Sequence, residues 1–529
     1  MAVRKTRVHN LAVLNHGLRW CHHDHPKITT HYTVVPRETD PRWKDVDMTR
    51  VSDEADVVIV GGGPAGLSAA IRLRQLATEA GKDLRVCLVE KASQLGLPMY
   101  NHGNYIVRLG NVVAWLGTQA EELGVEIYPG YAASEVLYHE DGSVKGVATN
   151  DVGIAKDGSP KEHFERGMEL HAKCTIFAEG CHGHLAKQLF KRFDLRKECQ
   201  PQTYGLGLKE LWEVDPAKHR PGLVMHSIGW PLHKDVYGGS FMYHLDEGSP
   251  LVSIGFVVGL DYQNPYLSPF REFQRYKTHP FIRNILQGGK RIGYGARALN
   301  EGGLQASASF FHFLPKLTFP GGCLVGCSPG FMNVPKVKGT HNAMRSAMVA
   351  ADAVFETLTQ ESASPTKGLE PSVYEQKIRD SPVWKELHSV RNVKPSFNTR
   401  LGLYGSVVLH GRILLPGTRK GAVDTVPQRY WQSRAHDAVG ADADRLQPAK
   451  NWQPIEYPKP DNEVSFDLLS SVALTGTNHE GDQPPHLTLM DDKVPVERNH
   501  AIYDGPEQRF CPAGKLHFSS LDCIARTTF

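Results

Sequence analysis

The sequence lacks any run of about 18 consecutive apolar residues, the length that a helix needs to cross a bilayer. We therefore expect no transmembrane helix, although a protein that lies on a membrane surface is not excluded. The sequence also lacks an excess of one charge, because the formal net charge is +3. Proteins that bind nucleic acids usually carry a strong basic excess, so we expect no nucleic-acid partner.

Cysteine is sparse, and its spacing does not resemble a disulfide or metal framework. Nine cysteines are scattered over the chain, and no Cys-x-x-Cys pair occurs. An odd number of scattered thiols is typical of a reducing compartment. The chain has 529 residues, which is too long for one compact core, so we expect two or three domains.

The first 50 residues are rich in arginine and poor in acids. Four basic residues precede the first acidic one, Asp24, and they are interleaved with apolar residues. This is typical of a mitochondrial transit segment, although the first serine is only Ser52. A transit-like segment and a disordered native N-terminus both fit this composition.

A glycine-rich turn follows the first strongly apolar strand. The run consists of Val57-Val58-Ile59-Val60, then Gly61-Gly62-Gly63-Pro64-Ala65-Gly66, then Leu67-Ser68-Ala69-Ala70-Ile71. It is a G-x-G-x-x-G pattern between a strand and a helix, the context of a dinucleotide-binding βαβ unit. Gly61 permits the tight turn, Gly63 leaves the backbone open to a pyrophosphate, and Gly66 lets the helix approach the strand. The helix N-terminus offers free N–H groups to the phosphates. The alternative is a glycine turn that serves packing alone.

A second strand is predicted over 84–90, and it ends at an acid. Glu90 follows Gly66 by 24 residues, where its carboxylate can accept hydrogen bonds from a ribose hydroxyl. Two further glycine turns lie downstream, at 178–183 and at 321–330, and each follows an apolar strand. Large two-domain flavoproteins use such turns to return the chain to the flavin, so the pattern favours FAD over NAD. We include Gly330 in the predicted FAD site.

The cysteines of these downstream turns require their own interpretation. Cys327 stands where flavoproteins of this kind carry an aspartate that holds the ribityl chain, and Cys181 lies in the other turn. A reactive thiol beside the flavin is one possibility. Cys327 has no nearby histidine and no Cys-x-x-Cys partner that would support redox catalysis, so we expect it to be a buried structural cysteine, and we expect the same of Cys181 and Cys323.

Several longer stretches resemble the electron transfer flavoprotein-ubiquinone oxidoreductase family. They lie at 101–110, 149–153, 177–185, 259–266, 294–300 and 326–335. The likeness covers about 55–95, 97–304, 314–400 and 445–514. It implies a monotopic enzyme on the matrix face of the mitochondrial inner membrane. Such an enzyme carries FAD and a 4Fe–4S cluster, and it passes electrons from reduced electron transfer flavoprotein to ubiquinone.

The resemblance also implies site residues beyond the FAD turn. Two adjacent glycines that contact the quinone in the family correspond to Gly238 and Gly239. Glycine suits a flat quinone ring because backbone N–H and C=O groups stay accessible. Without the resemblance, a plain hairpin turn is the simpler interpretation of the two glycines. One cysteine ligand of the cluster corresponds to Cys511, in an Arg-Phe-Cys-Pro-Ala-Gly motif.

We therefore predict an α/β fold with a Rossmann-type FAD-binding domain, an inserted α+β quinone-binding domain and an incomplete C-terminal ferredoxin-like domain. The expected parts are a transit-like segment at 1–50, a discontinuous FAD-binding domain at 51–201 and 315–358, a ubiquinone-binding domain at 202–314, a linker with an altered membrane-associated region at 359–444, and a truncated iron–sulfur domain at 445–529.

The sequence departs from the family pattern in three places. A long family segment is missing where Gly96 meets Leu97, 306–314 looks inserted, and 415–444 does not match the family's apolar membrane helix. After Cys511 only Cys523 remains, and the family's later C-x-x-C-x-x-C run is absent. We therefore expect no assembled cluster in this chain. Two alternatives stay open: a cluster-free FAD-dependent reductase or monooxygenase, and a non-functional isoform.

Overall fold

The structure is a computed structural model that describes residues 37, 40–90, 107–197, 199, 201–300, 314–334, 339–360, 368–391, 442–484, 489, 491, 493–514, 516–518 and 525–527. The transit-like segment up to residue 36, the join at residues 96 and 97, and Cys523 lie outside the described residues. Most of the expected insertion at 306–314 and of the altered region at 415–444 also lies outside them.

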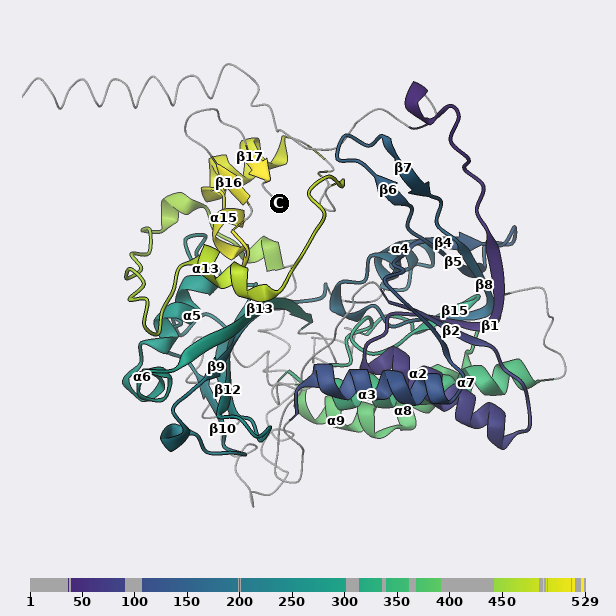
Figure 1. Ribbon diagram of the computed structural model, residues 1–529, viewed down its shortest axis with the longest axis horizontal. Coiled ribbons are helices and arrows are strands. Elements are labelled where there is room, and N and C mark those ends of the chain that lie inside the picture. The colour runs from purple at the N-terminus through teal and green to yellow at the C-terminus, as the bar shows by residue number, and fades with distance from the viewer. Residues whose placement is uncertain are drawn as a thin grey trace, which may run out of the picture.

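Eight strands of the described chain form the sheet of the first unit (Figure 1). Its main path is β14 (Thr318–Phe319), β15 (Gly322–Leu324), β8 (Glu169–Phe177), β1 (Ser52–Val60), β2 (Val86–Glu90) and β3 (Glu126–Pro129). The strands from β15 to β3 run parallel. The hairpin of β4 (Ala133–Tyr138) and β5 (Val144–Thr149) attaches to β8. This order confirms the predicted Rossmann-type α/β unit.

The central strands are apolar along their whole inner length because both faces are covered. Val57 pairs with Val86 on one side and with Cys174 on the other, and all three are buried. One face packs against helices, and the opposite face packs against the β4–β5 hairpin and α4 (His184–Arg192). A continuous apolar run rather than alternation is the pattern of a parallel strand buried on both sides.

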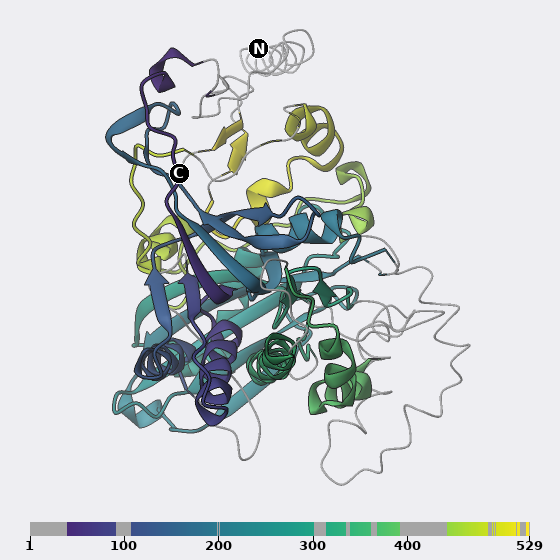
Figure 2. The same ribbon diagram turned by 90° about the vertical axis from the view of Figure 1, so that its right-hand side faces the viewer.

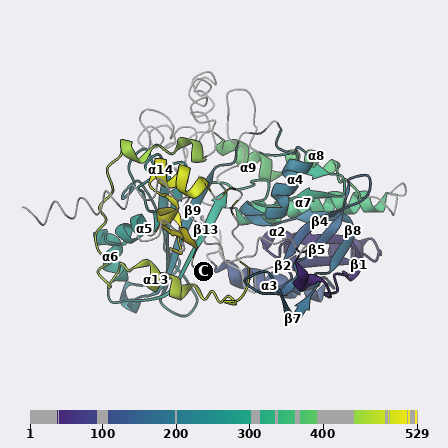
Figure 3. The same ribbon diagram turned by 90° about the horizontal axis from the view of Figure 1, so that it is seen from above.

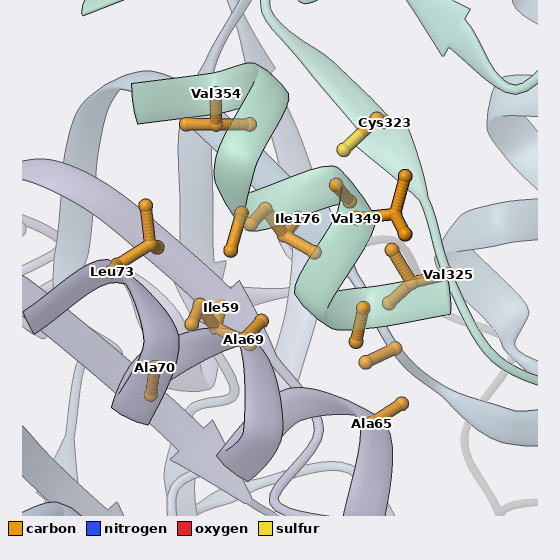
Figure 4. Packing of buried hydrophobic residues seen from close by; sticks show 14 of the residues in the cluster. Ile59, Ala65, Ala69, Ala70, Leu73, Ile176, Cys323, Val325, Val349 and Val354 are labelled. Atoms are coloured by element: carbon orange, nitrogen blue, oxygen red, sulfur yellow. The ribbon is translucent and has the colours of Figure 1, made fainter. Parts of the chain in front are cut away.

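Helices cover one face of this sheet as a layer (Figure 2). They are α2 (Pro64–Glu79), α3 (Leu109–Glu122), α7 (Thr340–Thr359), α8 (Val373–Asp380) and α9 (Pro382–Val390). Helices α2 and α7 meet through small residues, among them the buried alanine Ala69 (Figure 4) and the buried alanine Ala350. Alanine side chains allow close contact between the helices, so α7 lies beside α2 although about 260 residues separate Glu79 from Thr340 in sequence.

The second unit is a five-stranded antiparallel sheet (Figure 3). Its order is β10 (Val224–Ile228), β11 (Gly238–His244), β12 (Leu251–Gly259), β9 (Tyr204–Glu213) and β13 (Lys290–Asn300). Helices α5 (Pro269–Lys277) and α6 (Pro280–Leu286) pack on the face that points away from the first unit (Figure 1). The chain enters this sheet after α4 and returns to the first sheet at β14, so the second unit is an insertion, as predicted.

Short elements form the C-terminal part of the described chain, and two of them contact β13 and α5 of the second unit. They are α13 (Leu468–Val472), α14 (Ala501–Tyr503) and α15 (Glu507–Phe510), followed by the paired strands β16 (Leu516–Phe518) and β17 (Ala525–Thr527). Val464 is buried in the core of the second unit, and the Tyr294 hydroxyl donates to the Pro512 carbonyl at 2.9 Å. No helix within the described residues is both long and apolar enough to span a bilayer.

A buried ion cluster joins the sheet, α5 and this C-terminal part. The Lys277 ammonium lies 2.8 and 2.9 Å from the two Glu210 carboxylate oxygens, and both side chains are fully buried. Arg291 contacts Glu210 at 3.2 Å and donates to the Ser471 hydroxyl at 2.6 Å. Burial lowers the pKa of Lys277 to about 8, although Glu210 opposes this shift. The cluster therefore fixes the C-terminal part to the outer side of the sheet.

Candidate functional site

The first glycine turn needs glycine at two positions for packing. Gly61 has φ +105°, and a Cβ there would lie 2.6 Å from the Ala178 carbonyl oxygen. A Cβ on Gly66 would lie 1.9 Å from the Gly61 carbonyl oxygen. Neither position can accept a side chain without moving backbone, so Gly61 and Gly66 hold strand β1 and helix α2 in close contact.

Gly63 differs, because packing does not require glycine there. Its φ of −73° suits any residue, and nothing lies within 4 Å of a Cβ built on it. It is also the N-cap residue of α2, without a side chain to cap the first helical N–H groups. An open backbone at an uncapped helix N-terminus is the arrangement that receives a phosphate group. The geometry therefore fits the predicted pyrophosphate position.

Glu90 lies against the same turn. Its carboxylate oxygen accepts a hydrogen bond from the Gly62 N–H at 2.7 Å. A Cβ on Gly62 would come within 3.0 Å of the Glu90 Cβ, so the acid and the turn are in contact. This places a carboxylate at the carboxyl end of β2, where the predicted ribose contact requires it.

The second turn contacts the first and carries an acid whose role sequence reasoning missed. The Ala178 N–H donates to the Val60 carbonyl at 2.8 Å. The Glu179 carboxylate accepts from the N–H groups of Leu185 and Ala186, at 3.2 and 2.7 Å. Glu179 therefore satisfies the N-terminus of α4 and holds the turn against that helix. In the sequence, Glu179 lies six residues before Leu185 and seven before Ala186. This is not the spacing of a local helix cap, so the role of Glu179 becomes apparent only in the folded structure.

The third turn, at 321–330, contacts the same helix α2 that follows the first turn. Gly326 has φ +67°, and a Cβ on it would lie 3.0 Å from the Ala65 Cβ on helix α2. Its N–H donates to the Ser346 hydroxyl of α7 at 3.1 Å, and Gly330 has φ +104°. Three turns that are distant in sequence thus meet at the carboxyl ends of β1, β8 and β15, the edge at which parallel sheets bind ligands.

The cysteines of these turns are not activated. Burial raises the pKa of Cys327 to about 12, and burial also raises the pKa of Cys181 above its ordinary value. The Cys181 thiol donates to the Ala298 carbonyl at 2.9 Å. Both side chains therefore remain protonated at neutral pH, which supports the structural interpretation over a nucleophilic one.

Gly238 and Gly239 begin strand β11 and do not form a hairpin turn. A Cβ on Gly238 would lie 2.4 Å from the Val257 carbonyl oxygen, and one on Gly239 would lie 2.6 Å from the Ser227 carbonyl oxygen. Both glycines are therefore required by close contact with the neighbouring strands β12 and β10. Their contact with a quinone stays a prediction.

The metal site expected from the family does not fit the residues present. Cys511 follows helix α15 and is half-buried. Among the described residues, no group of three or more His, Cys, Asp or Glu side chains is arranged to hold a metal ion. A 4Fe–4S cluster takes four cysteine thiolates, whereas 462–525 contains only Cys511 and Cys523. We therefore derive no electron-transfer step through a cluster.

Comparison with family models gives three matches. Residues 204–299 match the model described as ETF-QO, ubiquinone-binding. Residues 462–525 match the 4Fe-4S model of electron transfer flavoprotein-ubiquinone oxidoreductase. Residues 59–124 match an NAD(P)-binding Rossmann-like domain. The second match includes Cys511, although the segment lacks the remaining ligands.

Curated relatives match over nearly the whole chain. The chain is 59% identical over 556 aligned residues to the mitochondrial electron transfer flavoprotein-ubiquinone oxidoreductase of Mus musculus, covering 94% of this chain and 86% of that protein. The Homo sapiens protein of the same description is 58% identical, with 93% and 86% covered. A geranylgeranyl bacteriochlorophyll reductase-like structure from Thermoplasma acidophilum has a TM-score of 0.49 at 16% identity, and it covers 70% of this chain and 95% of that one.

Proposed function

The chain belongs to the electron transfer flavoprotein-ubiquinone oxidoreductase family, and from that premise we propose that it binds FAD and passes electrons from reduced electron transfer flavoprotein to ubiquinone. One observation carries the proposal. Three glycine turns converge beside a backbone left open at Gly63, next to the sheet that matches the ubiquinone-binding model.

The residues that hold FAD follow from this geometry. Gly63 and the N-terminus of α2 receive the pyrophosphate, because free N–H groups and the helix dipole favour negative charge there. Glu90 accepts from the ribose of the adenosine half, and the turn at Gly330 lies toward the flavin half. FAD supplies the redox centre; the protein supplies position and surrounding charge.

The proposed electron donor explains what the site does not need. Reduced electron transfer flavoprotein is itself a folded protein, so no substrate carbon must reach the flavin. No general base need stand over the ring, and transfer depends on cofactor spacing and potential. The comparisons do not favour the two alternatives, a cluster-free reductase or monooxygenase and a non-functional isoform.

We also propose that the protein lies on the matrix face of the mitochondrial inner membrane as a monotopic protein. The relatives are named mitochondrial, and the arginine-rich first 50 residues are consistent with import. The family's long segment at 96–97 is missing from this sequence, and 415–444 does not match the family's apolar membrane helix. We therefore expect weak binding to liposomes. Tight binding that resists high salt would contradict this.

The absorption spectrum of the purified full chain, combined with flavin and iron analysis, tests the proposal. We expect stoichiometric FAD, reduction of that FAD by reduced electron transfer flavoprotein, and far less iron than a 4Fe–4S cluster requires. A folded but colourless protein would refute the FAD site. Rapid bleaching of the flavin by NADPH would instead favour a nicotinamide-dependent reductase.

A further inference from the structure

The two faces of the five-stranded sheet differ in chemistry. Leu206, Leu208 and Trp212 of β9 point into the core formed with α5 and α6. Residues between them on β9 belong to the opposite face, which looks toward the nucleotide-binding unit (Figures 1 and 3). Lys209 is one of these residues, so a cation stands on the inner face.

The strands around Lys209 leave room beside it. In register, Lys209 lies between Gly255 of β12 and Gly295 of β13. The ring of Phe241 covers Gly255, because a Cβ there would lie 2.2 Å from the Phe241 Cζ. A Cβ on Gly295 would meet nothing within 4 Å. The open side of Lys209 is therefore the space over Gly295.

A second cation borders that space. Arg297 is two residues beyond Gly295 on the same strand and pairs with Gly207, so it is the diagonal neighbour of Lys209. Among the described residues neither Lys209 nor Arg297 forms a hydrogen bond or an ion pair. Arg297 is exposed to water, whereas Lys209 is half-buried and has less access to solvent to balance its charge. Within the described residues, the half-buried cation and the open space beside it form a candidate ligand position.

Besides Arg297, one more cation acts on Lys209, and it is already paired. Arg108, just before α3, also raises the positive potential at Lys209, but Glu247 neutralises it in an ion pair of 2.6 Å. Burial, with Arg108 and Arg297 adding to it, lowers the pKa of Lys209 to about 8. The Lys209 ammonium therefore holds its proton at neutral pH and releases it more readily than an ordinary lysine.

The space lies between the predicted quinone contact and the flavin turns. Gly239, Val257, Gly207 and Arg297 form one row across four strands of the inner face. At its other end, β13 contacts both flavin turns: the Ala298 carbonyl accepts from Cys181, and the Asn300 amide donates to the Cys327 carbonyl at 3.4 Å. A ring bound over this face is thus close to both.

We propose that Lys209, with Arg297 beside it, binds a carbonyl oxygen of the quinone and gives that oxygen a proton as the quinone is reduced. This inference rests on the proposed function. Ubiquinone takes up two electrons, supplied by reduced electron transfer flavoprotein, and two protons. One proton moves from the Lys209 Nζ to one carbonyl oxygen, which becomes a hydroxyl group. The neutral amine then recovers a proton from water, and the second carbonyl oxygen takes its proton from solvent.

The test uses the FAD-loaded full chain and the variants Lys209→Met, Lys209→Arg and Arg297→Gln. Lys290→Met is the matched control, because Lys290 is an exposed lysine at the start of the same strand β13. Three quantities are measured: the affinity for a short-chain, water-soluble ubiquinone, the reduction of FAD by reduced electron transfer flavoprotein, and the pH profile of quinone turnover.

We expect kcat for quinone reduction to fall about 100-fold in Lys209→Met, as for loss of a general acid. Wild-type turnover should decline as the pH rises through 8, and that decline should disappear in Lys209→Met. Lys209→Arg should keep quinone affinity without restoring kcat, because arginine does not release its proton. Arg297→Gln should weaken quinone binding, while FAD reduction and the Lys290→Met control stay unchanged.

Each contrary result has a distinct meaning. If Lys209→Met keeps wild-type kcat and pH profile, the role of Lys209 is refuted while the proposed function stands. If the wild type accepts electrons but does not turn over quinone, the inference is tested by quinone affinity alone. Equal quinone affinity of the wild type, Lys209→Met and Arg297→Gln then refutes it. If the wild-type chain binds no quinone, both the inference and the proposed function fail.

Discussion

Gly63 and Gly66 separate the ligand-binding role of the first turn from its packing role. Gly63 has φ −73° and ψ −179°, and a Cβ there meets nothing within 4 Å. Gly63→Ala should therefore leave the free energy of unfolding unchanged or raise it by about 0.4–1 kcal/mol, because alanine restricts the unfolded chain. In Gly66→Ala the new methyl lies 1.9 Å from a backbone carbonyl oxygen, so we expect a loss of about 3 kcal/mol.

Gly63→Ala should weaken FAD binding although it does not destabilise the fold. The methyl of Gly63→Ala stands where the pyrophosphate approaches. Loss of two charge-assisted hydrogen bonds at about 1.5 kcal/mol each costs about 3 kcal/mol, which corresponds to about 100-fold weaker binding. Urea unfolding of the apoprotein, followed by circular dichroism, measures stability, and quenching of FAD fluorescence measures affinity. Wild-type FAD affinity in Gly63→Ala would refute the assignment of the open backbone to the pyrophosphate. Wild-type stability of Gly66→Ala would refute the packing argument.

Three further predictions concern carboxylates. Glu90→Gln should weaken FAD binding about tenfold, or about 1.4 kcal/mol, with little change in melting temperature, and equilibrium titration checks this. Glu210→Gln leaves two buried cations without a counter-ion and should cost about 5 kcal/mol, more than the roughly 3 kcal/mol expected for Lys277→Met; thermal unfolding compares them. The Arg85 guanidinium lowers the pKa of Glu126 to about 2, so Glu126 contributes stability that is lost as the pH falls from about 4.5 toward 2. Urea midpoints across that range should show this slope in the wild type and a smaller one in Arg85→Met.

The nucleotide-binding unit could be predicted from sequence because its signals are local. The strand, glycine turn and helix at 57–71 are contiguous and correspond to β1 and α2. Such elements are determined by periodicity and by residues that permit a turn.

The inner face of the second sheet could not be predicted in the same way. Lys209 and Arg297 are 88 residues apart in sequence, and only the register of β9 and β13 makes them neighbours. The cap that Glu179 forms on α4 also depends on a tertiary arrangement that no local pattern encodes. Register in an antiparallel sheet depends on which face is buried, which a single sequence determines poorly across a long insertion.

The position of β15 next to β8 has a consequence for biosynthesis. The turn at Gly326 contacts Ala65, yet the ribosome makes it more than 250 residues later, after the whole inserted sheet. Domains usually fold as units during synthesis, in order from the N-terminus. Here the sheet of the first unit lacks β15 beside β8 until the inserted sheet and the residues that follow it have been synthesised. Capture of the flavin is therefore expected to be a late event in maturation, and truncation anywhere before residue 330 should yield a chain that never acquires colour.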